Sequence, residues 1–307
     1  MKKASSADAK ESVIPTYANE QVLEEPARRI RQELYHDAGY DAIWRLSNCG
    51  FVLRLNTTYI FFDPILTSPL PSYVAHRKRV EEGGEHPYRL ELKYHDRPEN
   101  VSKEIHTLPL YPEEIEKADF VMLSHEHADH FDLTGLQRLA HLNPTIVAPR
   151  SCHAELKEIG YPERSIVEAG YGETREWNEF SMRIVPASHH GCTDACGYLL
   201  STRHGNIYFH GDGKFDHKDK EEVLGLDVDY LLLPINDTNL GVGFAALLTH
   251  LLQPRVVIPC HYGYIYPALR HQGGHPAEFV TALAARNYKI PGTDIMILSP
   301  GGRVILA

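Results

Sequence analysis

Six consecutive residues hold the densest group of metal-binding side chains in this chain: His125, Glu126, His127, Ala128, Asp129 and His130. Imidazoles and carboxylates are the donors that zinc, manganese and iron favour. Burying such polar groups costs free energy unless they find partners, so packing alone does not select this composition. The apolar stretch 119–124 comes directly before them and predicts a buried strand. We therefore expect a metal site at the end of this strand.

The spacing within the 125–130 run allows for more than one metal. His125 and His127 are two positions apart, so on an extended backbone both side chains point to the same side. Asp129 and His130 continue into the next turn. One metal could take the first pair, and a neighbouring metal could take the second pair.

Three later positions repeat the pattern of an apolar strand followed by a residue of ligand type. The stretch 184–188 ends at His189, 207–211 ends at Asp212, and 256–260 ends at His261. Ligands that recur at strand ends indicate a site along one rim of a sheet. His190 competes with His189 for the ligand position.

The elements that must position these residues alternate between short strands and helices. Strands are predicted within 42–62 and at 120–123, 145–148, 165–168, 180–185, 198–201, 207–210, 230–234, 256–259, 295–298 and 303–306. Helices are predicted at 20–35, 112–117, 133–141, 152–159, 244–252 and 276–286. This order indicates a layered α/β or α+β domain at 42–307, after an N-terminal extension at 1–41. The segment 65–107 is rich in proline, glycine and charge, and we expect an insertion there that forms a flap near the site.

Composition narrows the class of protein. Hydrophobic residues make up 43% of the 307 positions, which is enough for a full core. The formal charge of −10 argues against a nucleic-acid partner, because such proteins usually present a basic face. Five cysteines without a CxxC pair suggest a reducing compartment. No signal peptide or membrane span is expected, so the sequence predicts a cytoplasmic protein, with a homo-oligomer possible.

The order His125-x-His127-x-Asp129-His130, then His189, Asp212 and His261, resembles the metallo-β-lactamase superfamily over residues 42–307. Short phrases are similar to the ascorbate-6-phosphate lactonase branch, namely 62–64, 118–125, 186–189 and 258–263. A zinc phospholipase D acting on N-acylethanolamine phospholipids shares the same plan. The resemblance implies a four-layer αβ/βα sandwich with two mixed β-sheets.

The resemblance also implies a division of the ligands between two metals: His125, His127 and His189 for the first, Asp129, His130 and His261 for the second, and Asp212 as a bridge. The metals would be zinc or manganese, with iron as a further option, and would share a hydroxide that attacks a carbonyl or phosphorus. Asp212 and Asp129 would be catalytic, since Asp129 can also orient the nucleophile or move its proton. The family's usual Gly-Asp-Thr is here Gly211-Asp212-Gly213, and no cysteine is expected at a ligand position.

Four further residues are candidates outside the ligand set. Asp63, after Phe61-Phe62, would hold a ligand histidine through its other ring nitrogen or would cap a turn. Tyr262 and Lys214 would contact an anionic substrate or lie on the surface. His210 would line the substrate pocket or end its strand.

These observations favour a metal-dependent hydrolase that acts on a lactone or phosphoester of a small anionic metabolite. A phosphodiesterase acting on phospholipid or nucleic acid is one alternative. A metal-binding protein without hydrolytic turnover is the other.

Overall fold

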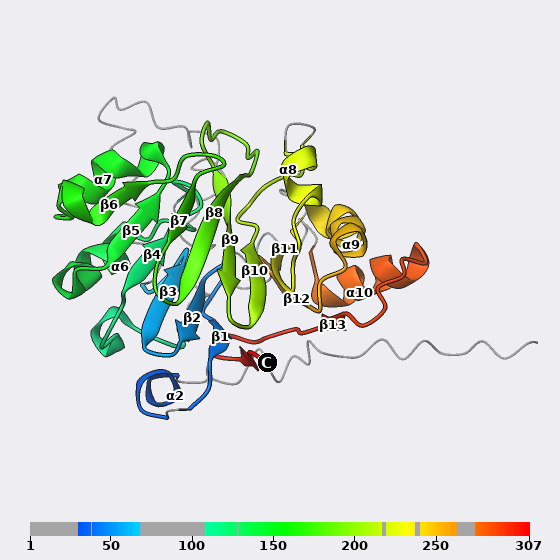
Figure 1. Cartoon of the computed structure of the whole chain (residues 1–307), viewed down its shortest axis with the longest axis horizontal. Coiled ribbons are helices and arrows are strands. Elements are labelled where there is room, and N and C mark those ends of the chain that lie inside the picture. The colour runs from blue at the N-terminus through cyan, green and yellow to red at the C-terminus, as the bar shows by residue number, and fades with distance from the viewer. Residues whose placement is uncertain are drawn as a thin grey trace, which may run out of the picture.

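The computed structural model describes residues 30–67, 108–262 and 274–307, apart from positions 38, 128, 217–218 and 237–239. Nearly all of the insertion expected at 65–107, and most of the extension expected at 1–41, therefore lie outside the described residues. Two β-sheets face each other at the centre of the molecule, and helices cover their outer faces (Figure 1).

The first sheet contains seven strands in the order β14 (Arg303–Ile305), β1 (Ala42–Arg45), β2 (Phe51–Leu55), β3 (Thr58–Phe62), β4 (Phe120–Met122), β5 (Thr145–Ala148) and β6 (Ile166–Glu168). Neighbours from β14 to β3 pair antiparallel, and neighbours from β3 to β6 pair parallel. The parallel half brings the carboxyl ends of β3 and β4 to the same edge of the sheet.

The second sheet repeats this plan with β13 (Asp294–Ile295), β12 (Val256–Cys260), β11 (Tyr230–Pro234), β10 (Gly205–Phe209), β9 (Cys196–Thr202), β8 (Phe180–Pro186) and β7 (Thr174–Glu176). Strands β10 to β13 are parallel, whereas β7 to β10 are antiparallel. Strands β10 and β12 therefore also end at one edge.

Helices form the two outer layers. On the first sheet lie α2 (Arg31–Tyr35), α6 (Leu133–Leu139) and α7 (His153–Glu158), and on the second lie α8 (Lys220–Leu224), α9 (Gly241–Leu252) and α10 (Pro276–Ala285). Helix α6 shows why the sequence folds this way: Asp132 caps its first turn at Gly135 N, and leucines at 133, 136 and 139 form one buried stripe. The four-layer sandwich with two mixed sheets that the sequence predicts is confirmed.

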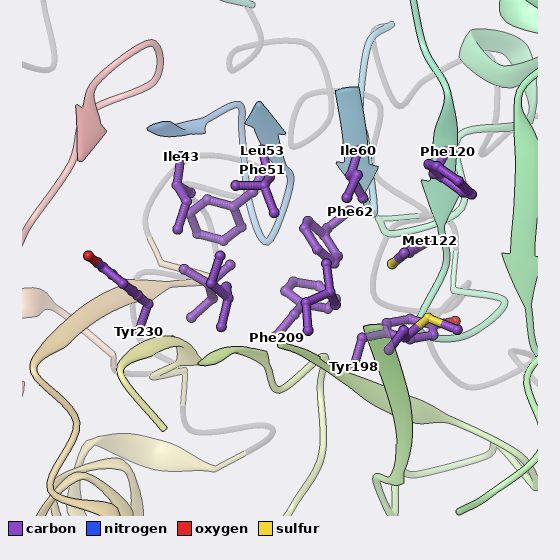
Figure 2. Close-up of a cluster of buried hydrophobic side chains, with 14 of the residues drawn as sticks. Ile43, Phe51, Leu53, Ile60, Phe62, Phe120, Met122, Tyr198, Phe209 and Tyr230 are labelled. Atoms are coloured by element: carbon purple, nitrogen blue, oxygen red, sulfur yellow. The ribbon is translucent and has the colours of Figure 1, made fainter. Parts of the chain in front are cut away.

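The central core lies between the two sheets (Figure 2). In β3, Ile60 and Phe62 point into this core, whereas Phe61 points to the helix layer, because successive side chains of a strand alternate. The rings of Phe62 and Phe209 meet across the sheets with their centroids 5.1 Å apart. Since both faces of these strands are covered, their sequences read as continuous apolar runs.

The expected elements match the structure within a few residues, with two omissions. Strand β7 has all three residues exposed, and α8 has only five residues, so neither has an apolar pattern to reveal it. Of the helix expected at 20–35, the structure has α2, which begins at Arg31 after Ile30, and positions 20–29 lie outside the described residues. Within the described ranges, no helix is long and apolar enough to cross a membrane.

Candidate metal centre

The predicted ligands gather where strands of both sheets end. The 125–130 run follows β4, His189 follows β8, Asp212 follows β10 and His261 follows β12. Each of these side chains is buried or nearly so, although each lies just outside a strand. Strands packed on both faces therefore hold a polar cluster at the rim between the sheets.

Three imidazoles form the first cluster. The ring centroids of His125, His127 and His189 lie 4.3 to 4.7 Å apart. His189 Nε2 faces His127 Nδ1 at 2.9 Å. His190 is exposed, so the structure brings His189 and not its neighbour into the cluster.

The second cluster combines imidazoles with carboxylates. Asp212 Oδ2 lies 3.1 Å from His130 Nε2 and 3.2 Å from His261 Nε2. Asp129 Oδ2 lies 3.3 Å from His261 Nε2 and 3.8 Å from His130 Nε2. Asp212 Oδ2 is also 4.0 Å from His189 Nε2, so this carboxylate lies between the two clusters.

The residues present fit divalent metals. His125 Nε2, His130 Nε2 and His261 Nε2 are buried and have no hydrogen-bond partner of acceptable geometry among the described residues. Elsewhere in the rings, His125 Nδ1 meets Ser124 Oγ at 2.8 Å, and His130 Nδ1 meets Asp63 Oδ2 at 2.7 Å. Buried nitrogens without a hydrogen bond cost free energy, and coordination by a metal would remove that cost.

The pKa shifts of the histidines differ between the two clusters. Burial lowers the pKa of His189 to about 4 and the pKa values of His125 and His127 well below their usual range. These rings are therefore neutral near pH 7, with lone pairs available for a metal. Burial also acts on His261, but the carboxylates of Asp212 and Asp129 outweigh it and raise its pKa to about 10.

The same balance holds for His130. Burial opposes its charged form, yet Asp212, Asp129 and Asp63 raise its pKa well above the usual range. Without metal, protons on His130 and His261 balance the charge of the acidic groups. A divalent cation at this position would replace those protons.

Asp63 contacts a ring of the second cluster and a residue that supports a ring of the first. It is fully buried, and its φ of 37° turns the chain sharply after β3. Its carboxylate accepts hydrogen bonds from Ser124 N at 2.7 Å and Ser124 Oγ at 2.5 Å, and pairs with His130 Nδ1. Through the Ser124 hydroxyl it also supports His125, so one carboxylate steadies a ring of each cluster.

Four residues that the sequence analysis did not single out for the site lie beside the clusters. Asn48 Nδ2 donates to Asp129 O at 3.0 Å and to Asp129 Oδ2 at 3.3 Å. Ser124 supports His125, as described above. Two cysteines, which were expected to stay away from ligand positions, approach the clusters: Cys49 Sγ lies 3.7 Å from Asp212 Oδ1, and Cys192 Sγ lies 3.6 Å from His127 Nε2. In the sequence, the turn residues at 48–50 and the position of Cys192 shortly after His189 could have indicated these contacts.

The remaining candidates lie around the clusters. His210 is buried against Gly213, where a Cβ atom would come within 2.8 Å of the His210 ring. A side chain at position 213 would therefore crowd the His210 ring. Lys214 is exposed next to Asp212. The hydroxyl of Tyr262 donates to Leu298 O at 3.2 Å, and its ring packs against the buried Arg45 guanidinium.

Comparison with known proteins agrees with this geometry. The model of a family described as the Beta-lactamase superfamily domain matches residues 99–262. A metal-dependent hydrolase from Pyrobaculum neutrophilum is 29% identical over 201 residues, covering 63% of this chain and 84% of the relative. A metal-dependent hydrolase from Thermococcus onnurineus is 31% identical over 200 residues, covering 62% and 82%.

Solved structures agree on the fold. A metallo hydrolase from the archaeon Ignicoccus hospitalis has a TM-score of 0.60 and 19% identity, covering 88% of this chain and 99% of that one. An isothiocyanate hydrolase from Delia radicum gut bacteria has a TM-score of 0.61 and 16% identity, covering 86% and 98%. On the family match and the Thermococcus relative, this chain belongs to the metallo-β-lactamase superfamily, as a metal-dependent hydrolase.

Proposed function

We propose that this protein is a dinuclear hydrolase that acts on a lactone or phosphoester of a small anionic metabolite. The observation that supports two metals is the place of Asp212. One oxygen, Oδ2, lies 3.1 Å from His130 Nε2, 3.2 Å from His261 Nε2 and 4.0 Å from His189 Nε2. A carboxylate oxygen in contact with both clusters suits a bridge.

The proposed ligands follow the two clusters. The first metal would be held by His125, His127 and His189, the second by Asp129, His130 and His261, and both by Asp212. Two divalent ions, zinc or manganese, with iron as a further option, would lower the pKa of a shared water and stabilise charge on the attacked group. Histidine and carboxylate donors without an obligatory sulfur suit all three metals.

The chain's own residues supply orientation and proton handling. Asp129 is partly exposed and fixed by Asn48, so its carboxylate can orient a water and hold its proton while the ring of His261 stays in place. Asp63 keeps Nδ1 of His130 occupied, which directs Nε2 into the site. These contacts fix the donors before substrate arrives, and such preorganisation is what lowers a reaction barrier.

The substrate class rests on two lines of support. The phrases at 62–64, 186–189 and 258–263 are similar to the lactonase branch, whose substrates are small and anionic. Lys214 is exposed directly after the Asp212 turn, and its backbone N–H donates to Ser188 O at 2.9 Å, beside His189. The exposed position of Lys214 beside this ligand loop supports a role for its ammonium group in binding an anionic substrate.

A substrate panel with metal-loaded protein tests the proposal. Turnover of lactones or of small phosphoesters is expected, and His127→Ala should abolish both turnover and binding of one metal while leaving most of the fold. His190→Ala is the matched control, because His190 is the neighbouring histidine outside the cluster. Near-normal turnover by His127→Ala would refute the assignment. Cleavage of bis-p-nitrophenyl phosphate without lactone turnover would instead favour a phosphodiesterase.

A further inference from the structure

A tight turn returns the chain from His189 to the first cluster. Between β8 and β9, Gly191 adopts a φ of 79°, which glycine accepts without strain, and Cys192 N donates to His189 O at 3.3 Å. Asp194 Oδ2 then accepts from Ser151 N at 3.0 Å and fixes the end of the turn. The result is that Cys192 Sγ lies 3.6 Å from His127 Nε2.

The two nitrogens of His127 face different partners. Nδ1 points at His189 Nε2, 2.9 Å away, so it is the nitrogen directed into the first cluster. Nε2 faces Cys192 Sγ, which lies 3.6 Å away, within hydrogen-bond reach for sulfur. A neutral imidazole carries its proton on only one nitrogen, so whichever group accepts at Nε2 decides whether the Nδ1 lone pair is free.

In two other rings a supporting partner likewise occupies one nitrogen, but there it is Nδ1 that meets the partner. His125 presents Nδ1 to the Ser124 hydroxyl, and His130 presents Nδ1 to the Asp63 carboxylate, leaving Nε2 of each ring directed into the site. His125 Nε2 is buried with no hydrogen-bond partner in the described part of the chain. His125, His127, His189 and Cys192 each offer one donor atom, and these atoms all lie within 4.8 Å of one another. The sulfur therefore lies close to the imidazoles of the first cluster.

We propose that Cys192 is a positioning residue for the first metal. Its sulfur accepts the N–H of His127 Nε2, which keeps the proton away from Nδ1 and holds the ring at the angle that the metal needs. The inference rests on the proposed metal centre and assigns a task within it. Partners of this kind typically change metal affinity by about 10-fold to 100-fold.

Metal titration of three variants tests the assignment. Cys192→Ala removes the acceptor, Cys192→Ser keeps an acceptor of similar size, and Thr193→Ala changes the adjacent exposed residue as a control. Affinity is measured by competition with a chelator. We expect Cys192→Ala to lower the affinity for one of the two metals by about 10-fold or more. Cys192→Ser should retain most of that affinity. Thr193→Ala should match the unaltered protein.

The cobalt-loaded protein separates positioning from coordination. If sulfur only accepts a hydrogen bond, the near-ultraviolet spectrum has no sulfur-to-cobalt charge-transfer band. A band that Cys192→Ser abolishes would show that sulfur is a ligand, and would overturn the proposal. Equal metal affinity for Cys192→Ala and the unaltered protein would overturn it too. If the unaltered protein binds no divalent metal, the proposed metal centre itself fails, which is a distinct result.

Discussion

Replacing Asp63 tests whether one carboxylate organises both clusters. Asp63→Asn preserves the size of the side chain but removes its charge, so His130 Nδ1 and the Ser124 hydroxyl lose a charged partner. We expect metal affinity to fall by about 10-fold to 100-fold, which is about 1.4 to 2.8 kcal/mol. The affinity for both metals should fall, because the Ser124 hydroxyl connects Asp63 to His125 in the first cluster.

Asp63→Ala should have a second effect, on the stability of the metal-free protein. It leaves the buried Ser124 N–H and the His130 Nδ1–H without an acceptor. The Ser124 hydroxyl is not counted, because it keeps its hydrogen bond with His125. An orphaned buried donor costs about 1 to 3 kcal/mol, so the two together cost about 2 to 6 kcal/mol. Urea unfolding with chelator present measures this loss, and calorimetry measures metal binding.

Asp132 provides the matched control. It is equally buried, and it accepts hydrogen bonds from Leu66 N, Thr67 N and Gly135 N, which lie outside the two clusters. Asp132→Asn should lower the free energy of unfolding while the folded protein keeps its metal affinity. If Asp63→Asn binds both metals as tightly as the unaltered protein does, the reasoning about this carboxylate is refuted.

Three further predictions concern pH, Asn48 and Gly213. The metal-free protein should be most stable near pH 6.5. Between about pH 4 and pH 6.5, His189 binds a proton in the unfolded chain but not in the folded one, so stability falls as the pH is lowered. Between pH 6.5 and about pH 10, His261 keeps its proton in the folded chain but not in the unfolded one, so stability falls as the pH is raised. Urea unfolding across pH checks this, and a flat profile would contradict it. Asn48→Gly keeps the left-handed backbone, φ 49°, but removes the side-chain amide that donates to the Asp129 carboxylate. Calorimetry should then show weaker binding of one metal. Unchanged binding of both metals would count against the role of Asn48. Gly213→Thr should lower the free energy of unfolding by about 1 to 3 kcal/mol, because its side chain crowds His210. Adding His210→Ala in the same chain should recover part of this loss. An unchanged unfolding midpoint for Gly213→Thr would exclude the crowding.

The fold was accessible from the sequence because its strands are covered on both faces. Apolar runs such as 230–234 and 256–260 became β11 and β12 with little change in their limits. Strand β7 escaped prediction because all three of its residues are exposed and its pairing with β8 comes only from the tertiary fold. The limits of the helices shifted by a few residues; α6 begins at Leu133 as predicted but ends at Leu139, where a 3-10 turn at Ala140–Leu142 follows.

The sequence by itself determined which donors are present and that each follows a strand, because both properties are local. Tertiary structure decided which donors meet and which ring nitrogen each directs inward, since these depend on turns that bring distant segments together. His189 enters the cluster and His190 faces solvent because of the backbone turn after β8. In the same way, Asn48 and Cys192 approach the site only because loops of opposite sheets end at one rim.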